Sequence, residues 1–193
     1  MSDLPPHPLD YAPPPPRRRF GLLLLIALAA LGVAGVVAYQ NSRPPHSARP
    51  VANRVKCAEN LRQIGNAMLL YAHDHGGKFP DTFEGLLGEG LSAEVFICWE
   101  SGDTQATGPT TQAIVAQWAI PGHLSYIYCG KGLTDESPAG TIVAYEPLAN
   151  HGGANSNVLF ADGHVAFIPA ATMNRILAEL AAGRNPPPSA RGL

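Results

Sequence analysis

An uninterrupted apolar segment near the N-terminus, Phe20–Ala38, constrains this sequence of 193 residues more than any other feature. The segment contains no charged residue, and its length is close to the ~20 residues with which a helix crosses a hydrocarbon core of about 30 Å. The rest of the chain is too short to enclose such a helix in a soluble core. The segment therefore predicts a single transmembrane helix in contact with membrane lipid.

The charges on either side of the segment do not fix its orientation. Arg17–Arg19 precede it and favour a cytoplasmic N-terminus, but basic residues also follow it, namely Arg43, Arg49, Arg54 and Lys56. A cleavable secretory signal is an alternative, with Val36–Ala38 as the cleavage site. Against it, the apolar run is longer than the usual signal core of about 7–15 residues. Both alternatives export the C-terminal part of the chain.

Three proline-rich stretches mark the ends of the folded region. Residues 1–19, 39–50 and 184–193 bury too little apolar surface to offset the entropy of ordering, so we predict a tail, a linker and a disordered C-terminal tail. The residues between them, 51–183, suit one domain. The net charge is only −2 and no basic cluster lies away from the apolar segment, so nucleic acid is not an expected partner.

The first part of this domain has the periodicity of a helix. Apolar residues recur every three or four positions from Val51 to Ala72, and Gly76 and Gly77 follow as C-terminal stop signals. A helix over 51–75 is long for so small a domain. We expect it to form a spine against which a sheet packs.

The second part has the pattern of short strands. Runs rich in β-branched and aromatic residues predict three of them, namely Val95–Cys98, Leu124–Cys129 and Thr141–Tyr145. The segment Asn157–Ile168 carries Asp162-Gly163 between two apolar runs, which is typical of a hairpin with a two-residue type I′ turn. Apolar spacing over 170–182 predicts a closing helix. Helices combined with an antiparallel sheet indicate the α+β class.

The three cysteines leave two kinds of site open. One disulfide and one free thiol is the simplest arrangement of Cys57, Cys98 and Cys129 in an oxidising compartment. Zinc is the competing idea, but no CxxC or HxxxH pair is present, so the spacing argues against a structural zinc site.

Other candidate ligands have simpler structural explanations. His151, Asp162 and His164 are residue types that suit a metal, and His73–His75 form a second such group. Asp162, however, stands where a hairpin turn already favours aspartate. The sequence has no GxSxG elbow and no phosphate-binding loop. We therefore predict no catalytic residue, no bound metal and no cofactor, and a protein that is not an enzyme.

Three passages of the sequence resemble, in the same order, three motifs of one protein family. They are KCAENLRQIGNAMLLYAHDHGGKFPD (Lys56–Asp81), VFICWESGD (Val95–Asp103) and YEPLANHGGANSNVLFADGHVAFI (Tyr145–Ile168). Together they resemble the planctomycete-type pseudopilin-like proteins, which have a Cys-x-x-Asn-Leu helix, a Cys-Pro-Ser-Asp segment and a histidine followed after nine residues by Asp-Gly. Here Trp99 replaces the proline, and ten residues separate His151 from Asp162.

The resemblance implies a fold and a role. Such proteins are similar to type II secretion pseudopilins: a membrane helix continues into a long spine helix packed on a small antiparallel sheet. It implies a single-pass protein of the cytoplasmic (inner) membrane, with residues 1–19 cytoplasmic and a periplasmic domain that contacts secretion or envelope proteins. It also implies a candidate disulfide between Cys57 and Cys98. Arg19 replaces the glycine of the usual leader and the segment lacks the usual glutamate, which affects processing and filament assembly.

The sequence also allows a second function. A tethered periplasmic domain could use His151, Asp162 and His164 for metal-dependent binding or hydrolysis. Metal analysis separates the two functions.

Overall fold

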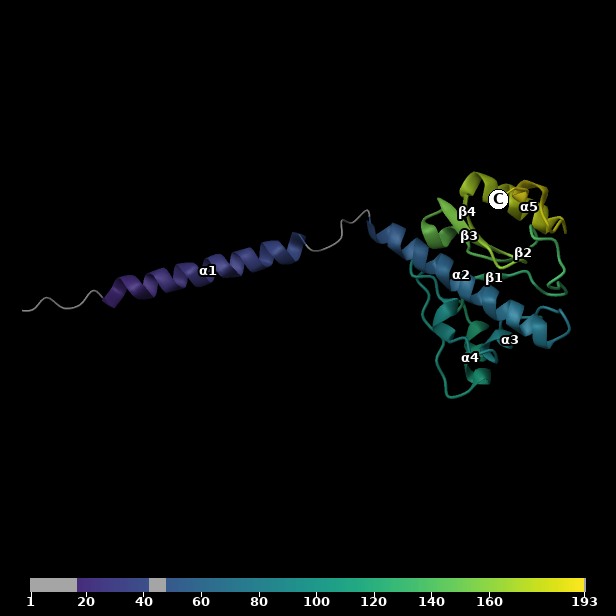
Figure 1. The fold of residues 1–193 in the computed structure, drawn as a ribbon, viewed down its shortest axis with the longest axis horizontal. Coiled ribbons are helices and arrows are strands. Elements are labelled where there is room, and N and C mark those ends of the chain that lie inside the picture. The colour runs from purple at the N-terminus through teal and green to yellow at the C-terminus, as the bar shows by residue number, and fades with distance from the viewer. Residues whose placement is uncertain (1–16, 42–47, 193) are drawn as a thin grey trace, which may run out of the picture. The chain divides into compact units, whose positions relative to one another are not determined.

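The structure is a computed structural model that describes residues 17–41 and 48–192. The described residues fall into two compact units, with the division after Pro45 (Figure 1). The first unit holds helix α1 (Arg17–Asn41), and the second holds all other elements. Residues 1–16 of the predicted tail and 42–47 of the predicted linker, with any continuation of the first helix into the spine helix, lie outside the described residues. The described ends of the tail and linker, residues 17–19, 39–41 and 48–50, are helical, and not the tail and linker that we predicted.

Helix α1 contains the whole of the predicted segment Phe20–Ala38. Its large apolar side chains between Leu23 and Val37 are exposed, as at Leu31, which is 69% exposed. Within residues 17–41 and 48–192, no helix has both the length and the apolar character that crossing a membrane requires. The helical conformation of this segment is thus established, whereas its membrane role stays a prediction.

The second unit is an α+β domain, as the sequence predicts. Its spine is helix α2 (Ala48–Asp74), which begins three residues before the predicted start. The sheet has four antiparallel strands in the order β1-β2-β3-β4. These strands are β1 (Ile127–Tyr128), β2 (Ile142–Tyr145), β3 (Asn155–Phe160) and β4 (Val165–Pro169). The remaining elements are α3 (Glu84–Leu87), η1 (Ala93–Phe96), α4 (Thr111–Trp118), η2 (Leu148–His151), α5 (Ala170–Ala181) and η3 (Pro188–Ala190).

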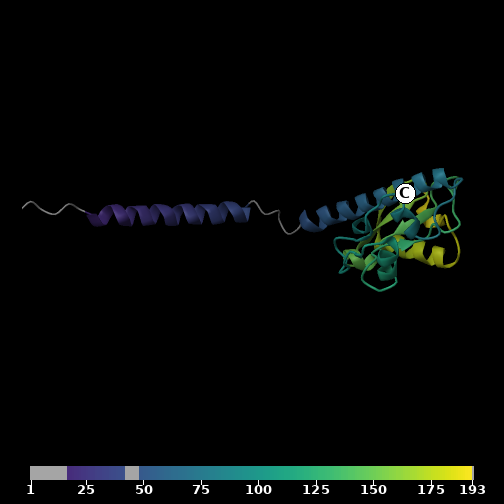
Figure 2. The same ribbon diagram turned by 90° about the horizontal axis from the view of Figure 1, so that it is seen from below.

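The sheet is buried on both faces, because α2 packs on one and α5 on the other (Figures 1 and 2). Side chains of β3 alternate between the two: Leu159 joins the cluster with α2, while Val158 and Phe160 join the cluster with α5. An irregularity in β2 between Ile142 and Ala144 breaks the same alternation. The sheet therefore has no solvent face over its central strands.

The apolar stripe of α2 is buried only in part. Leu61, Ile64 and Met68 are fully buried against the sheet, as expected, but Val51 and Val55 near the start of the helix are exposed. Gly76 and Gly77 have positive φ values of 65° and 81° just after the helix ends. They are the stop signals that the sequence predicts.

Two of the predicted strands differ in the structure. Val95–Cys98 is not a strand: Ala93–Phe96 form the 3₁₀ helix η1, because a four-residue apolar run fits any buried element. The strand predicted over Leu124–Cys129 shortens to β1, since the backbone N–H of Ser125 bonds to the carbonyl of Phe96 instead of to a neighbouring strand.

The hairpin between β3 and β4 is confirmed, but its turn type was predicted wrongly. A type I′ turn needs positive φ at both central residues, and only Gly163, at 87°, has it. The Phe160 carbonyl accepts from the Gly163 N–H, and the Phe160 N–H bonds to the His164 carbonyl. This pattern closes a three-residue loop with glycine in the left-handed position.

The C-terminal segment 184–192 was predicted to be a disordered tail and is instead packed on the domain. The Asn185 side chain bonds to both the N–H and the carbonyl of Ile142, at 2.8 Å each. Ala190 in η3 is buried in the cluster that contains α5. Proline-rich composition did not predict this, because the side chain of Asn185 bonds to Ile142 at the part of β2 that the short strand β1 does not reach.

Candidate functional site

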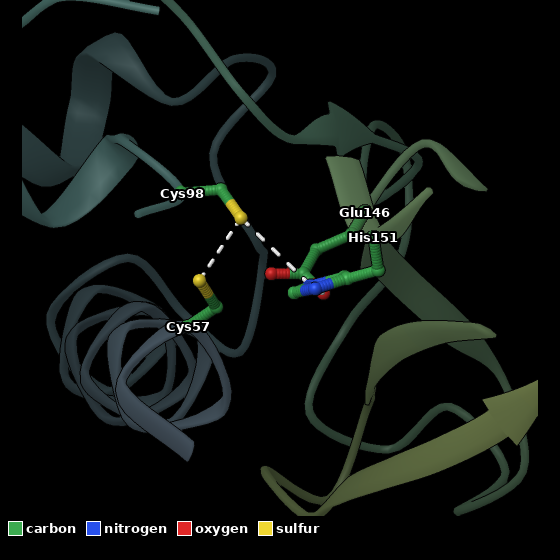
Figure 3. Close-up of side chains that lie close together, drawn as sticks. All are labelled: Cys57, Cys98, Glu146 and His151. Atoms are coloured by element: carbon green, nitrogen blue, oxygen red, sulfur yellow. Dashed lines mark hydrogen bonds and ion pairs between the residues drawn. The ribbon is translucent and has the colours of Figure 1, made fainter. Parts of the chain in front are cut away.

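Four side chains that could hold a metal ion meet between α2 and the sheet (Figure 3). Cys57 comes from α2, Cys98 follows η1, Glu146 follows β2 and His151 ends η2. Their potential ligand atoms all lie within 4.8 Å of one another. The four residues are 0%, 1%, 0% and 8% exposed, respectively, so the cluster is closed to bulk solvent.

The two cysteines are brought together by the motif residues around them. Their sulfur atoms lie 2.9 Å apart, as two thiols. Asn60, one turn after Cys57 on α2, donates from its side chain to the carbonyl of Ile97 at 3.0 Å and so fixes the segment just before Cys98. The adjacency that the disulfide prediction required is present, and the covalent bond itself stays a prediction.

Glu146 enters the cluster because strand β2 ends beside β3. One carboxylate oxygen, Oε2, accepts from the backbone N–H of Asn157 at 3.1 Å and from its side-chain amide at 2.9 Å. The other oxygen, Oε1, is buried and has no hydrogen-bond partner among the described residues. A buried carboxylate oxygen without a partner is costly, so this atom is a candidate ligand.

His151 is held from both sides of its ring. Its Nδ1 lies 2.9 Å from a carboxylate oxygen of Glu100, and its Nε2 lies 2.7 Å from Glu146 Oε2 and 3.8 Å from Cys98 Sγ. Gly152 follows with a positive φ of 62°, which ends η2 and lets the chain turn into β3. The ring is therefore oriented with Nε2 toward the other three residues.

The environment shifts the pKa values of two cluster residues. Hydrogen bonds with Cys98 and Glu146, and one with Glu100, raise the pKa of His151 to about 10 against the opposing effect of burial. The hydrogen bond with Cys57 and burial raise the pKa of the Cys98 thiol far above its usual value. At physiological pH the Cys98 thiol is thus neutral, and the raised pKa of His151 favours its protonated form when no metal is bound.

Two thiols, one imidazole and one carboxylate are a ligand set that suits zinc and related ions. The absence of close pairs such as CxxC led us to predict no structural zinc site. The four residues of this cluster instead come from four separate elements. Sequence reasoning identified Cys57, Cys98 and His151 but missed Glu146. One signal for Glu146 was present in the sequence. Each of the three passages that carry the family resemblance contributes a residue to the cluster, and Glu146 is the second residue of the third passage.

The structure does not assemble the predicted trio of His151, Asp162 and His164. His151 lies beside Asn157 near one end of β3, whereas Asp162 follows the other end, about 15 Å along the strand. Asp162 and His164 instead form their own exposed pair at the hairpin turn, where Asp162 accepts from the backbone and the ring of His164.

The other sequence candidates are also explained by local structure. His75 stacks on Tyr71 and its ring bonds to the Tyr71 carbonyl at 2.8 Å, while His73 and Asp74 are exposed. Ser125, which the sequence does not single out, donates to Asp103 at 2.5 Å and has no histidine as a partner among the described residues. Neither group has the geometry of a hydrolytic site.

No protein-family model matches this chain, and no curated protein and no solved structure is significantly similar to it. The closed cluster of Cys57, Cys98, Glu146 and His151 is accordingly interpreted from its own geometry.

Proposed function

We propose that this chain is a non-enzymatic, pseudopilin-like protein of the inner membrane, anchored by Phe20–Ala38 and acting through protein contacts in the periplasm. Secretion or envelope proteins are the partners that the resemblance implies. The observation that carries the proposal is the apolar helix that precedes a compact domain.

The anchor is proposed from the apolar character of Phe20–Ala38 in the sequence, because the described part of helix α1 does not by itself meet the criterion for crossing a membrane. A helix that is apolar all round suits hydrocarbon or a protein core, and the large apolar side chains from Leu23 to Val37 are exposed. Arg17–Arg19 suit a cytoplasmic end, but basic residues also follow the segment, so the orientation is proposed from the family resemblance.

The closed cluster supports a non-enzymatic role. A catalytic metal or thiol needs an open position for substrate, and every member of the cluster is buried. The cluster also joins α2 to the sheet, so its evident contribution is to hold the domain together.

The surface of the domain supports a role in protein contacts. Val51 and Val55 are exposed one turn apart at the start of α2, and Trp99 is 53% exposed beside Lys56. Partly covered apolar and aromatic groups of this kind are common at protein interfaces. The alternative of hydrolysis by His151, Asp162 and His164 is not favoured, because β3 separates these residues.

Fractionation and protease accessibility test the proposal. We expect the full chain in the membrane fraction, extracted by detergent but not by high salt or alkaline carbonate, with the domain digested by protease added to spheroplasts. The control lacks residues 20–38 and should be soluble. Recovery of the intact full chain in the soluble cytosol would refute the proposal.

Mass spectrometry of the mature N-terminus then defines the anchor. A chain that begins at Met1 or Ser2 has a permanent anchor, and one that begins at Phe20 has been processed like a pilin. Cleavage after Ala38 would contradict the anchor and indicate secretion.

A further inference from the structure

We propose that Cys57, Cys98, Glu146 and His151 bind one divalent cation of the zinc class, which fastens α2 to the loop after η1 and to the sheet. This inference does not depend on the membrane anchor or on the partners proposed above. It rests on the ligand set, on an unpartnered buried oxygen and on the groups that orient the ligands.

The number and type of ligands fit a structural site. Four protein ligands complete a tetrahedron, and sulfur, imidazole nitrogen and carboxylate oxygen are all zinc ligands. Each residue offers one atom, and all four atoms lie within 4.8 Å of one another. Burial of all four leaves no position for a substrate, which is typical of a structural site.

The sulfur–sulfur distance requires only a small movement. Two thiolates bound to one zinc at about 2.3 Å lie about 3.8 Å apart at the tetrahedral angle. The observed distance is 2.9 Å, so the sulfurs would separate by about 0.9 Å. A disulfide would need a similar movement in the other direction, to about 2.05 Å. This distance alone therefore does not distinguish the two states.

The unpartnered oxygen of Glu146 favours the bound cation over the disulfide. Asn157 holds Oε2 with two N–H groups, which leaves Oε1 buried with no donor among the described residues. A disulfide between Cys57 and Cys98 would leave this oxygen as it is. A cation bound to it supplies the missing partner.

Groups around the cluster hold the ligand side chains in position by hydrogen bonds. The Nδ1 of His151 bonds to Glu100, the carboxylate–histidine arrangement that fixes Nε2 as the ligand atom. The backbone N–H of Trp99 donates to Cys57 Sγ at 3.3 Å, a bond that stabilises a thiolate and that a proline at this position could not make. On binding, the cation displaces the two thiol protons and the proton on His151 Nε2, and these three protons leave to solvent.

Metal binding by the full chain in detergent tests the inference. The reduced protein is loaded with Zn²⁺, dialysed, and analysed for metal by mass spectrometry. We expect one zinc per chain. Replacement by Co²⁺ should produce the visible spectrum of a tetrahedral site together with a sulfur-to-cobalt charge-transfer band. In moderate urea, where the metal-free domain opens, zinc should also slow the alkylation of two of the three thiols.

The variants assign the site to these residues. Cys98→Ser and Glu146→Gln should lose the bound metal, and Glu100→Gln, which removes only the group that orients His151, should weaken zinc binding about 10- to 100-fold. The matched controls are Cys129→Ser and the pair Asp162→Asn with His164→Gln, which should still bind one zinc.

Three results would overturn the inference. The first is a reduced wild-type chain that retains no metal. The second is full metal binding by Cys98→Ser or Glu146→Gln. The third is protein isolated from cell envelopes with Cys57 and Cys98 joined in a disulfide and no metal present. Because the cobalt spectrum and the thiol protection are measured on the wild-type chain, failure of a variant to fold does not affect the conclusion.

Discussion

Asn157→Ala offers the sharpest test of how the cluster is held in the metal-free domain. The Asn157 side chain is buried and donates to Glu146 Oε2 at 2.9 Å and to the carbonyl of Arg54 on α2 at 3.3 Å. It therefore connects the carboxylate, β3 and the spine helix. Its removal leaves a buried carboxylate and a partly buried carbonyl each short of one donor.

The expected cost follows from these two bonds. A hydrogen bond to a charged group contributes about 1.5–3 kcal/mol, and one to a neutral carbonyl about 1 kcal/mol. We therefore expect Asn157→Ala to lower the free energy of unfolding by about 3 kcal/mol. For a domain of this size that corresponds to a fall in Tm of about 9 °C.

Urea unfolding of the 46–193 fragment, with a chelator present and circular dichroism as the signal, measures this cost. The control is Asn150→Ala, which removes one bond to the neutral carbonyl of Ser125 and should cost about 1 kcal/mol. In a Glu146→Gln background the cost of Asn157→Ala should fall to about 2 kcal/mol, because both acceptors are then neutral. A loss for Asn157→Ala no larger than that of the control would refute the reasoning.

Three further predictions concern the rest of the domain. Asn185→Ala should lower the free energy of unfolding by about 2 kcal/mol, because two bonds to the backbone of Ile142 are lost. Gly163→Ala should destabilise the hairpin by about 1–2 kcal/mol, because φ at this position is 87°. Partial burial tends to raise the pKa of Asp162, but the hydrogen bonds from His164 outweigh it and hold that pKa below its usual range. A folded-state pKa below the unfolded one stabilises the domain above about pH 3.9. Asp162→Asn should therefore cost stability at pH 7, and the difference from wild type should vanish as the pH falls below that value.

Each of these has a control in the same unfolding assay. Ser189→Ala removes one hydroxyl bond to Glu179 in the same C-terminal segment and should cost less than Asn185→Ala. Gly102→Ala has open space around the new methyl group and no positive φ, so it should be near neutral. A neutral Gly163→Ala, or an effect of Asp162→Asn that does not change with pH, would contradict the corresponding prediction.

Local sequence patterns predicted the elements whose signals are long or specific. The spine helix, the β3–β4 hairpin and the closing helix all have sustained periodicity or a turn signal, and the structure contains each of them. The strand predicted over Val95–Cys98 has neither: Val95 and Phe96 belong to the 3₁₀ helix η1, and Ile97 and Cys98 follow it. A short apolar run indicates that its residues are buried, but it does not specify whether they form a helix or a strand.

For the site, the sequence raised Cys57, Cys98 and His151 as candidates but predicted no bound metal, and it raised the apolar segment as a candidate anchor. Only the tertiary structure decided that Glu146 joins them and that Asp162 and His164 do not. Glu146 has no local signature, because its burial depends on the pairing of β2 with β3 and on the two N–H groups of Asn157. Ligands contributed by four separate elements become neighbours only when those elements pack, so no spacing in the chain encodes this site.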